Sequence, residues 1–127
     1  MNQTIYTSAE EQSFSLSREL KQFTGTEQWY RHNLVQGMLY TDGVQFFAEH
    51  AGAYWFLDIV ATEIFPMQDK QQFMVVTLTA EDNKGSITAT DGNGGQVYAR
   101  EIEFTDCPVG GWDFYLTDNV LLLPSEY

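Results

Sequence analysis

Residues 74–90, MVVTLTAEDNKGSITAT, decide the fold. Apolar and polar side chains alternate along Met74–Ala80 and again along Ser86–Thr90, which is the two-residue period of a strand with one buried face. The polar residues between these runs, Glu81–Gly85, predict a turn. We therefore expect a β-hairpin at this point of the chain.

Further strands are predicted on the C-terminal side of the hairpin. A glycine-rich turn leads to a third strand, about Gln96–Phe104, whose apolar residues change parity and indicate a bulge near Arg100 or Glu101. Alternation returns at Trp112–Leu116, and Val120–Leu123 completes a last hairpin. The second half of the chain thus predicts an antiparallel meander.

Before Pro66 the apolar residues recur every three or four positions, which is typical of amphipathic helices. Asp42 stands three residues before Gln45, the spacing of a capping box, and Pro66 blocks continuation of the last helix. We expect helices at about Ser15–Phe23, Asp42–Ala51 and Ala53–Phe65.

This order of elements predicts an α+β fold, with three N-terminal helices packed on one face of an antiparallel four- to five-stranded meander. The mixed segment Gln28–Tyr40 adds a strand or two, broken at Gly37. A chain of 127 residues fits one domain. We expect that domain at 14–127, preceded by a polar, flexible arm at 1–13.

The charge is lopsided: 18 Asp and Glu against 6 Lys and Arg give a net charge of -12 at pH 7. Such a field repels nucleic acids and anionic membranes and favours basic protein surfaces, although net charge also serves solubility alone. Cys107 is the only cysteine, which excludes an internal disulfide, and it is expected to be a small buried residue. The chain lacks the pattern of a signal peptide or a membrane span, so the sequence predicts a cytoplasmic protein.

The first functional hypothesis is a non-enzymatic interaction protein that binds a basic protein surface. An accessory or anti-defence (anti-CRISPR-like) inhibitor could use carboxylates that imitate DNA phosphates. No phosphate loop, dinucleotide fingerprint, GxSxG, HExxH or paired CxxC is present, so no cofactor or catalytic residue is predicted. The expected partner-binding residues are acids of the meander: Glu81, Asp82, Asp91, Glu101, Glu103 and Asp106.

The alternative hypothesis is a small enzyme or a ligand- or metal-binding domain. Its candidate residues are Tyr30, Arg31, His32, Asp42, His50 and Asp58. It requires His32 and His50, which lack a metal-binding spacing, to meet near Asp58. Otherwise we expect Asp58 to form a structural ion pair with Arg31, Arg18 or Lys21, and His32 to be an exposed strand residue. A third hypothesis is a homodimer formed through an exposed edge at Trp112–Tyr127.

Six short segments stand out: LKQFTGTE (20–27), WYRH (29–32), YTDGV (40–44), AGAYW (51–55), DNV (118–120) and LPSEY (123–127). Together these segments resemble a family of small uncharacterised bacterial proteins. The resemblance covers about Leu20–Tyr127 and identifies a domain of unknown function found in bacteria, plasmids and phages. It implies an intracellular protein associated with mobile elements, and it implies no catalytic residue.

Overall fold

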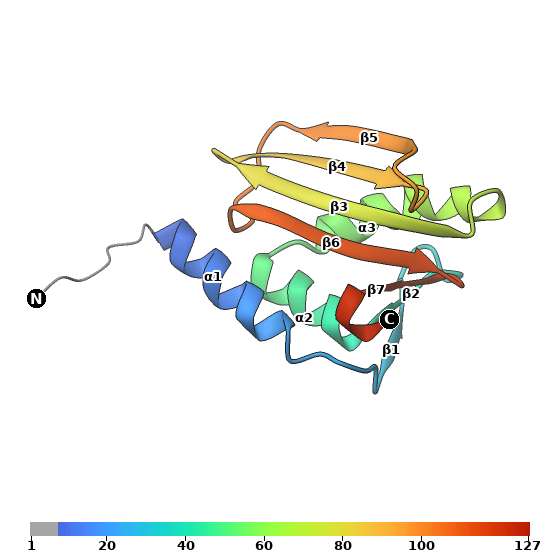
Figure 1. Ribbon diagram of the computed structural model, residues 1–127, viewed down its shortest axis with the longest axis horizontal. Coiled ribbons are helices and arrows are strands. Elements are labelled where there is room, and N and C mark those ends of the chain that lie inside the picture. The colour runs from blue at the N-terminus through green and yellow to red at the C-terminus, as the bar shows by residue number, and fades with distance from the viewer. Residues whose placement is uncertain (1–7) are drawn as a thin grey trace, which may run out of the picture.

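The computed structural model describes residues 8–127 and shows one β-sheet with helices on one face (Figure 1). The helices are α1 (Ser8–Leu20), α2 (Asp42–Ala51) and α3 (Tyr54–Ile59), and α3 continues into a π-helical turn (Val60–Ile64) and a 3-10 turn (Phe65–Asp69). The strands are β1 (Trp29–Arg31), β2 (Leu39–Thr41), β3 (Phe73–Glu81), β4 (Lys84–Thr90), β5 (Gln96–Ile102), β6 (Gly110–Thr117) and β7 (Val120–Leu122). A C-terminal 3-10 turn spans Pro124–Glu126.

The α+β class is confirmed, but the sheet is larger than the predicted meander. It has seven strands in the order β1-β2-β7-β6-β3-β4-β5, and β2 pairs with β7 in parallel. After β5 the chain returns across the sheet and β6 pairs with the free edge of β3. The strand or two predicted in the mixed segment Gln28–Tyr40 are present as β1 and β2, of three residues each, and their link to β7 enlarges the sheet beyond the predicted four to five strands.

Strand β7 joins the two parts of the sheet. It pairs with β6 through Tyr115–Thr117 on one side and with β2 through Leu39 and Tyr40 on the other. The expected exposed edge at Trp112–Tyr127 is wrong, because β6 lies inside the sheet and Trp112 is buried. The edge strands are β1 and β5.

The helices differ from the prediction mainly at their ends. Helix α1 begins at Ser8 rather than Ser15, so residues 8–13 of the expected arm are helical, whereas residues 1–7 lie outside the described part of the chain. The bounds of α2 are as predicted, but its N-cap is Thr41, whose hydroxyl accepts a hydrogen bond from the Val44 amide. The three helices are also not consecutive, since β1 and β2 separate α1 from α2.

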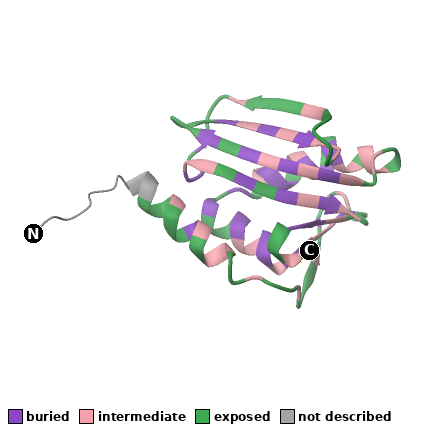
Figure 2. Cartoon of the chain, viewed as in Figure 1, coloured by how far each residue is buried: buried purple, intermediate pink, exposed green. Residues whose placement is uncertain are grey.

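Buried residues alternate with partly buried or exposed ones along β3, β4 and β6 (Figure 2). The buried side chains face α2 and α3, and a cluster of aromatic rings fills the centre. Phe114 of β6 contacts Phe47 of α2 and Phe56 of α3, each at a ring-centroid distance of 5.0 Å. In the described part of the chain the three α-helices lie on one side of these strands (Figure 1), and the alternate, less buried side chains project to the other side.

The irregularity in β5 lies earlier than predicted. Ala89 pairs with Tyr98 and Thr90 with Gln96, so Val97 is the extra residue, not Arg100 or Glu101. From Tyr98 onward, alternate residues of β5 return to the helix side, where Tyr98 and Arg100 both contact Glu63. None of the helices in residues 8–127 has the length and apolar character that a membrane span requires.

Candidate functional site

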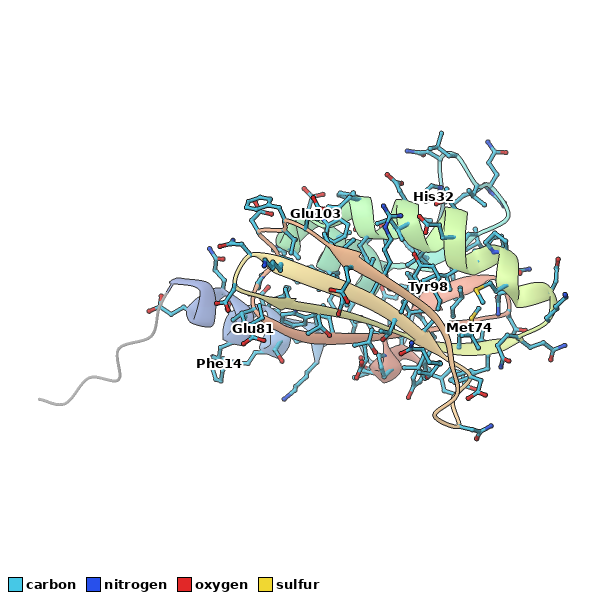
Figure 3. The ribbon with its side chains drawn as sticks, turned by 90° about the horizontal axis from the view of Figure 1, so that it is seen from above. Phe14, His32, Met74, Glu81, Tyr98 and Glu103 are labelled. Atoms are coloured by element: carbon cyan, nitrogen blue, oxygen red, sulfur yellow. The ribbon has the colours of Figure 1, made fainter. Side chains whose placement is uncertain are left out.

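Five of the six predicted acidic residues gather at one end of the sheet. Glu81 is the last residue of β3 and Asp82 lies in the β3–β4 turn, and Glu101 lies opposite Ser86 near the end of β5. The following loop, 103–109, carries Glu103 and Asp106. Figure 3 shows Glu81 and Glu103 at the same end of the molecule, together with Phe14 of α1. All five carboxylates are exposed.

Hydrogen bonds to its backbone groups fix the 103–109 loop against the β3–β4 turn and against β6. The Thr105 amide donates to the Asn83 carbonyl at 2.8 Å, and the Asn83 side-chain amide donates to the Thr105 carbonyl at 3.3 Å. The Trp112 indole N–H donates to the Pro108 carbonyl at 3.1 Å. Asp82 and Asn83 both have positive φ, a conformation that Asp and Asn tolerate better than most residues. The loop carboxylates are therefore held on a rigid support.

A groove extends this surface between α1 and the end of α2. It has a volume of about 690 Å³, and its lining includes four acids: Glu11, Glu19, Glu49 and Asp106. We use the name acidic end for these four residues together with Glu81, Asp82, Glu101 and Glu103. His50 and Pro108 also line the groove.

The basic residues leave most of the acidic end unneutralised. Lys84 lies opposite Glu81 in the β3–β4 pairing and is the base closest to the turn. The Arg100 guanidinium is on the helix side of the sheet, where it forms an ion pair with Glu63. Arg18 lies over the Phe14 ring at 5.8 Å. Phe14 and Phe104 are 65% and 72% exposed, so this end also presents aromatic surface.

Asp91 is separate from the other five predicted acids, because the β4–β5 turn lies at the opposite end of the strands. Its carboxylate accepts hydrogen bonds from the amides of Asn93 (2.8 Å) and Gly95 (3.0 Å). These two bonds lower the pKa of Asp91. Asp91 therefore organises its own turn.

The structure brings together two residues of the alternative site. His32 Nε2 lies 2.8 Å from Asp58 Oδ1, so the expected pairing of Asp58 with Arg31, Arg18 or Lys21 is wrong. His32 is buried in the loop after β1, not exposed on a strand, and its Nδ1 accepts the amides of Leu34 (3.2 Å) and Val35 (3.0 Å). Nδ1 is therefore unprotonated and Nε2 donates to Asp58. With both ring nitrogens engaged, His32 has no free lone pair for a general base.

The other candidates of that site have separate contacts. His50 is exposed in the last turn of α2, where its Nδ1 donates to the Phe46 carbonyl at 2.9 Å and its ring stacks on Phe46. The Tyr30 ring stacks on the Tyr40 ring, and the Arg31 guanidinium donates a hydrogen bond to the Gln36 carbonyl at 2.5 Å. Asp42 lies in the first turn of α2. Residues 8–127 contain no group of three His, Cys, Asp or Glu side chains that could hold a metal.

His32→Ala is expected to lower the free energy of unfolding by about 1–2 kcal/mol, because two loop amides and Asp58 lose their shared partner. The matched control is His50→Ala, which removes an exposed ring and should cost less than about 0.5 kcal/mol. Urea denaturation followed by circular dichroism measures both. Equal losses for the two variants would contradict the structural role of His32.

Burial raises the pKa of the Cys107 thiol to about 12, and neighbouring Asp106 adds to the effect. The buried thiol thus remains protonated at neutral pH, which makes it a poor nucleophile. This agrees with the expectation of a small buried residue.

The sequence gives no sign of the role of Glu126. Its Oε1 accepts hydrogen bonds from the Thr41 hydroxyl (2.7 Å) and the Leu123 amide (3.0 Å). Its Oε2 accepts from the Gly43 amide (3.2 Å) and the Thr26 hydroxyl (3.3 Å). Burial raises the pKa of Glu126 despite these donors, and the nearby Asp42 adds a smaller increase. All four bonds are internal, so Glu126 fastens the C-terminal turn to the start of α2.

Gly43 makes this contact possible. A Cβ atom at Gly43 would lie 2.6 Å from Glu126 Oε1 and 2.7 Å from Leu123 Cδ1. Any side chain would displace both groups, so the close approach of the C-terminal turn requires glycine here. Three of the segments that carry the family resemblance, 20–27, 40–44 and 123–127, meet at this point.

A comparison with curated proteins and with solved structures finds no match. One family model, described as a family of unknown function (DUF6876), matches residues 14–127. The match covers nearly the whole chain, and the chain therefore belongs to this family of unknown function.

Proposed function

We propose that this protein is a non-enzymatic interaction protein whose acidic end binds a basic surface of a partner protein. The observation that carries the proposal is the assembly of Glu81, Asp82, Glu101, Glu103 and Asp106 at one end of the sheet, next to a groove lined by further acids. Opposite charges steer such partners together and fix their orientation.

Two further observations support a protein partner. The loop that carries Glu103 and Asp106 is held by hydrogen bonds from the Thr105 amide to the Asn83 carbonyl and from the Asn83 side chain to the Thr105 carbonyl, so little ordering entropy is lost on binding. Exposed Phe14 and Phe104 add aromatic surface, which is enriched at the centre of protein interfaces. The net charge of -12 disfavours nucleic acid and anionic membranes as direct partners.

The resemblance to proteins of bacteria, plasmids and phages supports the biological setting of the proposal. We place the interaction in the cytoplasm, in keeping with a chain whose single cysteine is a free thiol. A mobile-element protein of this kind would act as an accessory or anti-defence inhibitor that occupies the basic surface of a nuclease or another nucleic-acid-binding protein.

The test compares two variants that each raise the net charge by two. Glu103→Gln with Asp106→Asn alters the acidic end, whereas Glu27→Gln with Asp69→Asn alters exposed acids elsewhere. We expect the first pair to weaken partner binding about tenfold and the second pair less than twofold.

The partner is captured from a bacterial lysate on the immobilised wild-type protein, eluted with a salt gradient and identified by mass spectrometry. Its affinity for each variant is then measured by calorimetry at two salt concentrations. Equal losses for the two pairs would mean that only net charge matters, and capture that resists salt would remove the electrostatic basis of the proposal.

A further inference from the structure

A second binding feature lies at the other end of the molecule, on the outer face of the sheet. Trp29 of β1 and Tyr127 at the C-terminus line a groove with a volume of about 320 Å³. Val120 and Leu122 of β7 also line it. Trp29 is 55% exposed and Tyr127 is 74% exposed, so two aromatic rings from distant parts of the chain border an apolar floor. We call this groove the aromatic slot.

Pairing in the sheet explains why these side chains share a face. Residues directly opposite in a ladder project to the same side, and Val120 lies opposite Thr117 and Leu122 opposite Tyr115. The Tyr127 ring packs against the Tyr115 ring at a centroid distance of 5.2 Å and against the Phe73 ring at 5.9 Å. The hydrogen bonds of Glu126 hold the preceding residue. Tyr127 is therefore fixed in position although it is exposed.

The charges around the slot determine which ligands it can accept. No lysine or arginine lines it, whereas Asp118 and Glu126 do. Both Glu126 oxygens already accept two hydrogen bonds each, so Asp118, exposed at the β6–β7 turn, is the carboxylate available to a ligand. An anion would be repelled, and a cation would be attracted both by Asp118 and by the faces of the rings.

From this geometry we propose that the aromatic slot binds the guanidinium side chain of an arginine presented by a partner. Its methylene stem would pack on Val120 and Leu122, its planar head would stack between Trp29 and Tyr127, and Asp118 would accept its hydrogen bonds. This proposal does not depend on the acidic end, because the slot lies at the opposite end of the strands.

The test uses a matched pair of probes, N-acetyl-arginine methylamide and its neutral isostere N-acetyl-citrulline methylamide. Binding is followed by NMR through the indole N–H signal of Trp29, identified by its loss in Trp29→Phe. We expect saturable shifts with the arginine probe and at least about tenfold weaker binding of the citrulline probe.

Variants then locate the site. Tyr127→Leu and Asp118→Asn should each weaken binding of the arginine probe about tenfold, and Asn is well tolerated at the positive φ of Asp118. The control is Leu34→Ala, which removes a side chain that is 78% exposed and lies outside the slot, and binding should not change.

Three results would each overturn the proposal. They are equal binding of the two probes, unchanged binding in both Tyr127→Leu and Asp118→Asn, and no shift of the Trp29 signal with the arginine probe. The same titration on Glu103→Gln with Asp106→Asn separates this inference from the proposed function, because those substitutions should leave binding to the slot unchanged.

Discussion

Replacing Phe114 with alanine is expected to lower the free energy of unfolding by about 3–5 kcal/mol. The Phe114 ring is fully buried and touches Phe47 and Phe56, so it joins β6 to both α2 and α3. Its removal leaves a cavity at the centre of the core, where rigid elements on three sides cannot close the gap. A domain typically has only about 5–15 kcal/mol of stability, so this single change should bring it near unfolding.

The matched control is Phe104→Ala, which deletes the same side chain at a position that is 72% exposed and should cost less than about 0.5 kcal/mol. Urea denaturation monitored by tryptophan fluorescence compares the two. Since Phe114→Ala could fail to fold, Phe114→Leu provides a milder variant with an expected loss of about 1–1.5 kcal/mol. A loss for Phe104→Ala as large as that for Phe114→Leu would be incompatible with this core.

The second large effect is expected for Glu126→Ala, with a loss of about 2 kcal/mol. The substitution removes the acceptor of four donors, including the hydroxyl of fully buried Thr41 and the amide of Leu123. The substitution also removes a carboxylate that is unfavourably buried beside Asp42, and this gain offsets part of the cost. The expected loss of stability is therefore smaller than the sum of four hydrogen bonds. Thermal unfolding measured by calorimetry would show the change.

Ser125→Ala is the control for this substitution, because Ser125 is the exposed neighbour in the same turn. Its expected cost is below about 0.5 kcal/mol. NMR of the Glu126→Ala variant should show the largest shifts at Thr26, Thr41 and Gly43, since these residues lose their partner. Shifts confined to the C-terminal turn would indicate that Glu126 does not fasten it to α2.

The sequence predicts features that depend on local pattern and misses those that depend on distant contacts. Strands β3, β4 and β6 are long enough for alternation to be visible, and α2 has an apolar stripe that fixes its bounds. The place of β6 beside β3, by contrast, follows from pairing between segments about forty residues apart. The periodicity within either segment does not indicate which other strand it pairs with.

The candidate site shows the same division. The residues of the β3–β4 turn and the end of β5 are adjacent because a predicted hairpin brings them together, so the grouping of Glu81 and Glu101 could be expected from the sequence. The sequence pattern also assigns Asp91 to this group, but the length of β4 places Asp91 at the far end of the same strands. The bond of His32 to Asp58 spans 26 positions and that of Thr26 to Glu126 spans 100. Such contacts can be identified only when the whole fold is known.

The position of β7 has a consequence for how the protein acquires its structure during synthesis. Strands β1 and β2 leave the ribosome before the other strands, yet in the described part of the chain they join the rest of the sheet through β7, which emerges after all the other strands. The parallel pair of β2 with β7 closes a loop of about eighty residues, a contact of high sequence separation that forms slowly. The complete sheet can therefore form only after β7 has left the ribosome, and until then β2 and β6 each have an unpaired edge that a chaperone or a second nascent chain could occupy.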